Sequence, residues 1–225
     1  MKYAGLEQKI RAEKVIETLR RATKNMVKPA CTQIIDQFGR DPFLVLISCL
    51  LSLRTKDTVS LPASIRLFKY AKTPTEMLLL PAPQIAEIIY PVGFYRRKAV
   101  NIHEVCNTLL DQFGGKVPSS EQELLTIKGV GRKTANLVLG EGFGIPSLCV
   151  DTHVHRISNR LGFVATTTPE ETELALQRLL PKEYWVEYNR LLVMWGQNIC
   201  VPISPFCSRC PISDLCPKVG VTQRR

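Results

Sequence analysis

The sequence lacks the segments that would hold a protein in a membrane or direct its secretion. No apolar run among its 225 residues is long enough to span a bilayer. The first 24 residues lack the apolar core of a secretory signal, and their hydrophobic positions follow helical spacing instead. We therefore expect a cytoplasmic protein in a reducing compartment, where its eight cysteines would not form a disulfide framework.

The sequence also has no low-complexity segment or long linker, and its strand signals are weak. Helical periodicity recurs between short joints marked by proline or glycine, which predicts an all-α protein. Capped helix starts are expected at Asp41-Pro42, Ser119-Ser120 and Thr168-Pro169. Segment 141–150 holds two glycines and a proline, so it is the expected domain boundary. The expected helices are 5–24, 28–38, 42–52, 57–70, 74–80, 83–90, 94–113, 119–126, 131–140, 150–161, 169–180 and 183–197.

Acidic residues are few relative to basic ones. The chain has 20 Asp and Glu residues against 30 Lys and Arg residues, a net charge of +10. A charge of this size favours a polyanionic partner, either nucleic acid or an acidic membrane surface. Because no membrane segment is evident, nucleic acid is the better prediction.

Four cysteines gather near the C-terminus in the spacing C-x6-C-x2-C-x5-C. They are Cys200, Cys207, Cys210 and Cys216. Thiolates suit an iron–sulfur cluster or a tetrahedral zinc ion, and structural zinc usually takes two close pairs. Only one pair is close here, which favours a [4Fe–4S] cluster over zinc; a disulfide with two core cysteines is a further alternative. Four other cysteines are scattered and are expected to be small buried hydrophobes: Cys31, Cys49, Cys106 and Cys149.

Residues 124–139 read LLTIKGVGRKTANLVL and predict two helices joined by a glycine turn. Gly129 and Gly131, on either side of Val130, permit a tight turn with positive φ angles. Backbone amides at a helix start favour an anion, and Lys128 and Arg132 add positive charge beside them. The turn is therefore a candidate site for DNA phosphate, although an ordinary helix–helix turn has the same pattern.

Lys133 and Asp151, which both follow this turn in the sequence, are candidate catalytic residues. Lys133 lies in the first helical turn, where the helix dipole and Arg132 disfavour an ammonium and favour the neutral amine that a nucleophile needs. Its alternative is a solvated surface lysine. Asp151 in LCVDTHVHR precedes a helix, so it is either a plain N-cap or a carboxylate that stabilises positive charge during glycosidic bond cleavage.

Taken together, GVGRKTAN, VDTHVHR and the cysteine pattern resemble the endonuclease III family of helix-hairpin-helix DNA glycosylases. The segments at 43–57, 93–102 and 114–139 extend this resemblance over nearly the whole chain. It implies two helical domains with a cleft between them for DNA. One would be a six-helix barrel at 36–145 with the helix-hairpin-helix at about 119–140, and the other an iron–sulfur domain of 1–35 plus 146–225.

The resemblance also implies a role for each matching residue. Lys133 would attack C1′ of a damaged nucleotide and form a Schiff base, with Asp151 assisting. The hairpin residues Gly129, Val130 and Gly131 would bind phosphate through their amides. β-Elimination would then cleave the strand, as expected of a base excision repair enzyme that acts on oxidised or ring-saturated pyrimidines. The four clustered cysteines would hold a [4Fe–4S] cofactor.

Two positions depart from better-known bacterial members of the family. Arg54 stands where they have a glutamine that fills the gap of the flipped base or contacts the orphaned base, and arginine can do both. Phe94 stands where an intercalating leucine is common, and it would still supply an apolar wedge.

Three other functions compete with this prediction. Monofunctional mismatch glycosylases resemble the chain, but they usually lack a lysine at the position of Lys133 and use water as the nucleophile. A non-catalytic DNA-binding iron–sulfur module would need neither Lys133 nor Asp151, and an electron carrier would not need a phosphate-binding turn. We therefore expect a monomeric glycosylase and lyase that acts on double-stranded DNA with a damaged or abasic nucleotide, near the nucleoid of a prokaryote.

Overall fold

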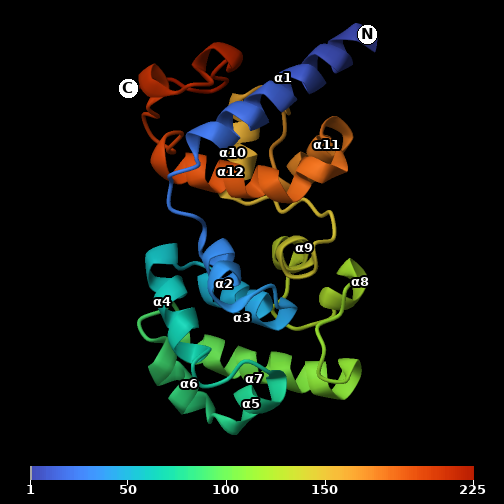
Figure 1. The fold of residues 1–225 in the computed structure, drawn as a ribbon, viewed down its shortest axis with the longest axis vertical. Coiled ribbons are helices and arrows are strands. Elements are labelled where there is room, and N and C mark those ends of the chain that lie inside the picture. Colours follow the sequence, from blue (N-terminus) through green and yellow to red (C-terminus); the bar gives the residue numbers. More distant parts are fainter. Residues whose placement is uncertain (1) are drawn as a thin grey trace. The chain divides into compact units, whose positions relative to one another are not determined.

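The computed structural model describes residues 2–225, and the side chains from residue 6 onward, and within this range it contains helices and loops but no strand (Figure 1). The α-helices are α1 Lys2–Ala22, α2 Ala30–Phe38, α3 Pro42–Ser52, α4 Asp57–Leu67, α5 Pro74–Leu79, α6 Ala82–Ile89, α7 Tyr95–Phe113, α8 Glu121–Leu124, α9 Arg132–Leu137, α10 Thr152–Arg160, α11 Pro169–Leu179 and α12 Trp185–Asn198. The other helices are the π-helix η1 Val138–Phe143 and the 3₁₀ helices η2 Lys182–Tyr184, η3 Cys207–Arg209 and η4 Ser213–Leu215. The all-α prediction is confirmed.

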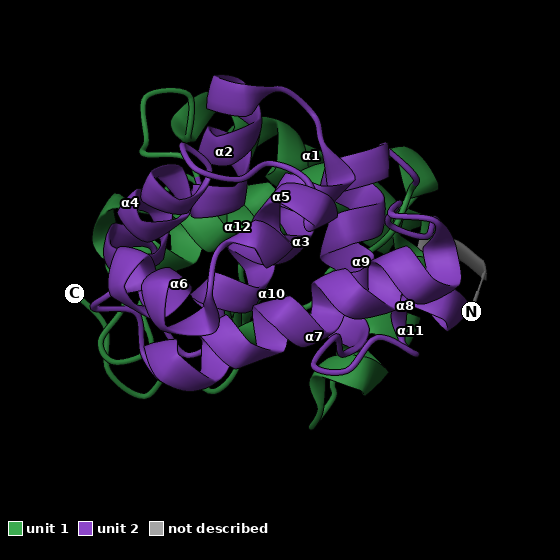
Figure 2. Ribbon diagram, turned by 90° about the horizontal axis from the view of Figure 1, so that it is seen from below, with its two compact units in different colours: residues 1–28, 146–225 green, residues 29–145 purple. Residues whose placement is uncertain are grey.

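The chain forms two compact units, coloured separately in Figure 2. Unit 1 comprises Met1–Lys28 and Pro146–Arg225, and unit 2 comprises Pro29–Ile145. Helix α2 lies in unit 2, whereas the sequence prediction put residues 29–35 with the other domain. The reason is that Ile34 is buried in the core of unit 2 and the Ala30 amide donates to Asp57 Oδ2 at 3.3 Å. The barrel and iron–sulfur domain assignments stay predictions.

The core of unit 2 is built around α3. Every residue from Phe43 to Leu51 is buried, so this helix is covered on all sides, as expected of a helix that is apolar all round. Its start is set by Asp41, whose Oδ1 accepts from the amides of Phe43 at 2.8 Å and Leu44 at 3.2 Å. This is the capped start that the sequence predicted, with Pro42 in the first turn.

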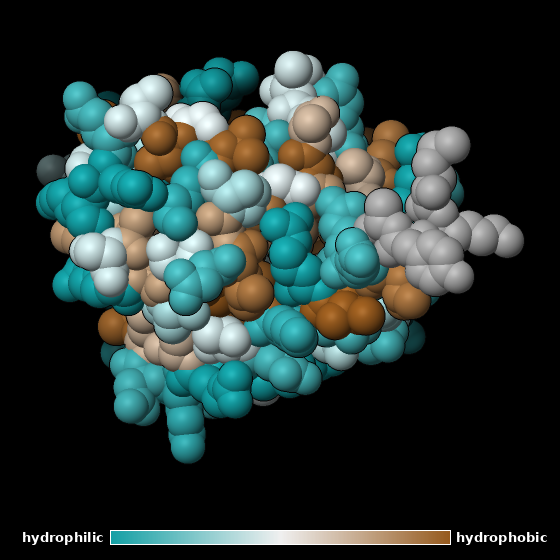
Figure 3. Space-filling view, turned by 90° about the horizontal axis from the view of Figure 1, so that it is seen from above, coloured by the Kyte–Doolittle hydropathy of each residue, from teal (hydrophilic) through white to brown (hydrophobic). Residues whose placement is uncertain are grey.

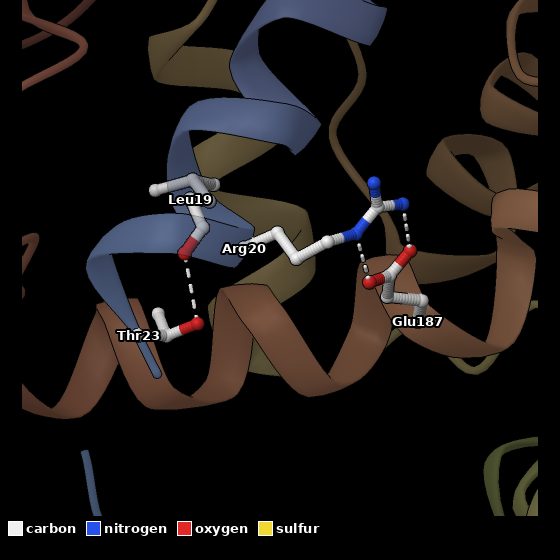
Figure 4. Close-up of polar contacts among 4 residues, drawn as sticks. All are labelled: Leu19, Arg20, Thr23 and Glu187. Carbon is white, nitrogen blue, oxygen red and sulfur yellow. Dashed lines mark hydrogen bonds and ion pairs between the residues drawn. The ribbon is translucent and has the colours of Figure 1, made fainter. Parts of the chain in front are cut away.

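Unit 1 has a separate core in which α1 packs against α12. The buried stripe of α1 includes Val15, Ile16 and Leu19, which join a cluster around Trp195 of α12. On the surface, Arg20 forms a two-pronged ion pair with Glu187, with both N–O distances at 2.7 Å (Figure 4). Because the pair is exposed, it contributes about 0–1 kcal/mol, and the buried stripe is the stronger link.

The expected boundary segment 141–150 contains the division between the two units, but the helix before it ends at Phe143 instead of residue 140. Helix α9 continues without a break into the π-helix η1, which extends to Phe143. Gly142 makes this possible, because a Cβ there would lie 3.0 Å from the Cα of Pro42 on α3. Glycine thus allows close packing at this position instead of ending the helix, and the unit boundary follows at Ile145 and Pro146.

The surface is mixed in character. On the face in Figure 3, hydrophobic residues form small groups that are separated by hydrophilic ones. In the described part of the chain, no helix combines the length and apolar character needed to cross a membrane.

Candidate functional site

The turn between α8 and α9 is anchored by Val130. Its side chain is only 6% exposed, and its amide donates to Ile127 O at 3.0 Å. Gly129 on one side has φ +89°, in the left-handed region that favours glycine. Gly131 on the other side has φ −97°, an angle that other residues adopt as readily. Both glycines are exposed, so the turn presents its backbone to solvent while Val130 holds it to the core.

Helix α7 packs against the turn through Asn101 and Glu104. A Cβ on Gly129 would lie 2.7 Å from Asn101 Nδ2, so the backbone and this side chain are in close contact. One turn further along α7, Glu104 accepts from Lys128 Nζ at 2.7 Å. On the other flank of the turn, Arg132 Nη1 lies 3.1 Å from a Glu121 carboxylate oxygen. Both basic residues that flank the turn therefore have acidic neighbours.

Lys133 is the second residue of α9, and its side chain is exposed. The three residues that follow it, Thr134, Ala135 and Asn136, are buried. The residues of α9 therefore change from exposed to buried between Lys133 and Thr134. The buried residues fix the backbone beside Lys133, whereas Lys133 itself is exposed.

Four of the predicted DNA-contacting residues come together around one hollow of about 600 Å³ in unit 2. Arg54 and Phe94 line it from two loops, and Lys128 and Gly129 line it from the turn. The sequence analysis missed further lining residues on α7: Arg97, Lys98 and Asn101. The basic run Arg96-Arg97-Lys98 was the available signal.

Asp151 lies in unit 1, at the start of α10. Its Oδ1 accepts from the amides of His153 at 2.9 Å and Val154 at 2.8 Å, so the N-cap role is confirmed. The side chain is half-buried, and both capping hydrogen bonds go to the same oxygen, Oδ1. The cap therefore fixes the carboxylate through Oδ1 and does not use Oδ2.

The four clustered cysteines of unit 1 are half-buried free thiols that line a single cavity together with apolar side chains such as Ile157, Trp195 and Ile212. Burial raises the pKa of Cys210 and Cys216, so these thiols would resist ionisation without a metal to stabilise the thiolates. In the described residues, no three Cys, His, Asp or Glu side chains are grouped for a single metal ion. Four thiols around one apolar cavity nevertheless match the donor set of an iron–sulfur cluster.

The remaining cysteines separate into two kinds. Cys49, Cys106 and Cys149 are buried as expected, and burial raises the pKa of Cys106 to about 12. Cys31 is only half-buried, so that expectation was wrong for it. The reason is its place near the start of α2, at the edge of the unit 2 core.

The family assignment follows from sequence comparison. Residues 47–182 match the model of the HhH-GPD superfamily base excision DNA repair protein. The chain is 46% identical over 196 residues to Endonuclease III of Thermotoga maritima, a match that covers 85% of this chain and 92% of that protein. The chain belongs to the endonuclease III family. As a member of this family it is a base excision repair enzyme of the DNA glycosylase and AP lyase type.

Solved structures show the endonuclease III fold as well. A non-covalent Endonuclease III–DNA complex matches with a TM-score of 0.81 and 33% identity, covering 93% of this chain and 95% of that one. A trapped covalent Endonuclease III–DNA intermediate matches with a TM-score of 0.80, also at 33% identity, covering 93% and 96%. A thermostable thymine-DNA glycosylase matches with a TM-score of 0.82 at 25% identity, covering 96% and 98%.

Proposed function

We propose that this endonuclease III family member removes oxidised or ring-saturated pyrimidines from double-stranded DNA and then cleaves the strand through a Schiff base on Lys133. The observation that carries the proposal is the exposed lysine at the second position of α9, beside a turn that presents its backbone. A covalent DNA intermediate of a 33% identical relative supports the reaction class.

In the proposed reaction, the neutral amine of Lys133 attacks C1′ and the glycosidic bond breaks. The bonding electrons leave with the base, which is then protonated. The amine loses a proton and the sugar ring opens to give the Schiff base. Loss of a C2′ proton and departure of the 3′ phosphate then complete β-elimination. The Asp151 carboxylate would stabilise the positive charge that develops at C1′.

Phosphate would be bound at the turn by the amides of Gly129 and Gly131. The amide of Val130 is occupied by Ile127, so it would contribute only if that bond opened. Lys128 and Arg132 would exchange their carboxylate partners for phosphate. Arg54 and Phe94 would enter the duplex beside the flipped nucleotide, where Phe94, at 64% exposure, serves as the apolar wedge.

The cofactor would be a [4Fe–4S] cluster held by Cys200, Cys207, Cys210 and Cys216. When bound, it would hold together a C-terminal segment that otherwise has only short 3₁₀ helices and loops. We assign it no part in bond breaking.

The test is borohydride trapping on a duplex that carries one thymine glycol. The wild type should give a covalent protein–DNA adduct, because borohydride reduces the Schiff base. Lys133→Gln should give no adduct while duplex binding stays within about threefold of wild type. Lys128→Gln is the matched control, since it removes a neighbouring charge but not the nucleophile, and it should still be trapped.

One observation favours a second candidate, a monofunctional mismatch glycosylase. The thymine-DNA glycosylase structure resembles the chain as closely in fold as the endonuclease III structures do. That function predicts release of a mismatched base by the wild type without any trapped adduct. Base release with intact binding but no adduct would favour it over the lyase.

We also propose that the enzyme is monomeric and works at the nucleoid of a prokaryote. Support for the prokaryotic source comes from a bacterial relative of which the match covers 92%. Light scattering of the purified protein, with and without a lesion duplex, tests the monomer.

A further inference from the structure

Lys98 joins the end of α3 to the start of α7. Its Nζ donates to three oxygens: Leu51 O at 2.7 Å, Leu53 O at 2.6 Å and Thr55 Oγ1 at 3.1 Å. An ammonium has three hydrogens, so this geometry uses all of them. Leu51 belongs to the last turn of α3, where carbonyls lack helical partners and the helix dipole favours a cation.

Thr55 extends this connection to a second loop. Its hydroxyl accepts from Lys98 and from the Gly93 amide at 3.2 Å, and it donates to Leu53 O at 3.3 Å. These bonds use its one donor and both acceptor positions. The loops are also in backbone contact, because a Cβ on Gly93 would lie 3.1 Å from Arg54 O. Lys98 and Thr55 together fasten loop 53–55 to loop 93–94.

Each loop carries a residue in an uncommon backbone conformation. Arg54 has φ 54° and Phe94 has φ 58°, both in the left-handed region that residues other than glycine rarely adopt. They are the only such residues in the described part of unit 2. Both side chains are exposed on the same hollow. Such conformations persist only where surrounding contacts enforce them, and they often mark functional positions.

We propose that Lys98 is a positioning residue that holds Arg54 and Phe94 as one preformed pair, so that selection of the base opposite the lesion depends on its ammonium. The inference rests on the proposed function and adds a specificity determinant to it. Arg54 is the residue that would meet the orphaned base, and Phe94 is the wedge beside it. Without the ammonium, the two would move independently and enter the duplex in several geometries.

The experiment uses the full-length protein with its metal content matched across variants. Single-turnover excision of thymine glycol is measured opposite A, G, C and T, and the ratio of the fastest to the slowest rate is the readout. Trapping at an abasic site in single-stranded DNA is measured in parallel, because no opposite base is present there. We expect Lys98→Met to reduce the opposite-base ratio about tenfold and to leave single-strand trapping within about twofold.

Three further variants keep the test decisive. Lys98→Arg retains the charge and should preserve most of the ratio. Thr55→Val removes the hydroxyl at nearly constant shape, and it should reduce the ratio as Lys98→Met does, which covers the case in which Lys98→Met does not fold. Lys69→Met, an exposed lysine of unit 2 outside the hollow, controls for the loss of one charge.

Three results would overturn the inference. The first is a wild-type ratio in Lys98→Met or Thr55→Val. The second is a loss of single-strand trapping that parallels the loss on duplex DNA, since this would indicate a purely structural role. The third is absence of trapping by the wild type itself, which would reject the proposed function and this inference together and so is distinguishable from the first two.

Discussion

The Nζ of Lys128 lies 2.7 Å from Oε1 of Glu104, at the edge of the turn that we propose for phosphate binding. Side-chain exposures of 75% and 39% show that the pair is open to solvent. An incoming phosphate therefore competes with a carboxylate that is already present. Exposed pairs of this kind contribute only about 0–1 kcal/mol, so the competition is weak and readily reversed.

Removing this competitor should tighten DNA binding. Glu104→Gln is expected to raise duplex affinity by about two- to fivefold at low salt, with a smaller gain at high salt because the interaction is screened. Fluorescence anisotropy over a salt series measures it. Asp111→Asn, an exposed acid on the same helix, removes the same charge away from the turn and should have a smaller effect. Equal gains from both variants would mean that net charge alone is responsible.

The two roles of Asp151 can be separated by substitution. Asparagine keeps the capping oxygen, so Asp151→Asn should retain stability while base release slows by about 10²–10⁴. Asp151→Ala should also lose about 0.5–2 kcal/mol of the free energy of unfolding. Asp41 has the same capping geometry at α3, so Asp41→Ala should lose similar stability without the loss of chemistry. Normal base release by Asp151→Asn would reject the catalytic assignment.

The two glycines of the turn should respond differently to alanine. Gly129→Ala combines φ +89° with a Cβ placed 2.7 Å from Asn101 Nδ2, so it should lower the free energy of unfolding by about 1–2 kcal/mol and weaken duplex binding. Gly131 has φ −97° and nothing within 4 Å of the place that a Cβ would take, so Gly131→Ala should change stability by less than about 0.5 kcal/mol. Chemical denaturation and anisotropy measure the two effects. Equal stability losses would contradict the backbone assignment.

Alkaline pH should stabilise the fold through Lys98. Burial lowers the pKa of Lys98 to about 8, whereas an unfolded lysine has a pKa of about 10.4. Between about pH 8 and about pH 10.4, the unfolded chain binds more protons at Lys98 than the folded protein does. The contribution of Lys98 to the free energy of unfolding therefore rises with pH in this range, and it is lost as the pH falls through about 8. Denaturation of wild type and Lys98→Met at about pH 7.5 and about pH 9.5 isolates it, because the other titrating groups are shared. A pH-independent difference between the two proteins would refute the shift.

Metal content should depend on the clustered cysteines alone. Cys210→Ser is expected to lose iron, acid-labile sulfide and visible absorption, and the C-terminal segment should become sensitive to protease. Cys31→Ser changes a half-buried cysteine outside the set and should retain all of them. Equal amounts of iron and sulfide, about four of each per chain, distinguish the cluster from zinc. Stoichiometric zinc without sulfide would overturn the cofactor assignment.

Features that depend on near neighbours in the chain could be predicted from the amino-acid sequence alone. Helical periodicity predicted the all-α class, and local caps placed the starts of α3 and α11 at Asp41 and Thr168, because a capping oxygen reaches only two or three residues along the chain. The glycine turn and the cysteine spacing are equally local. They carried the family resemblance that the comparisons bear out.

Features that depend on contacts between distant segments could be read only from the folded chain. Helix α2 belongs to unit 2 because Ile34 finds its core there, and η1 stays helical because Gly142 fits against Pro42. The Lys98 network joins residues more than 40 positions apart. No periodicity or spacing reports such a contact, since the ammonium meets its three acceptors only after α3 and α7 have packed.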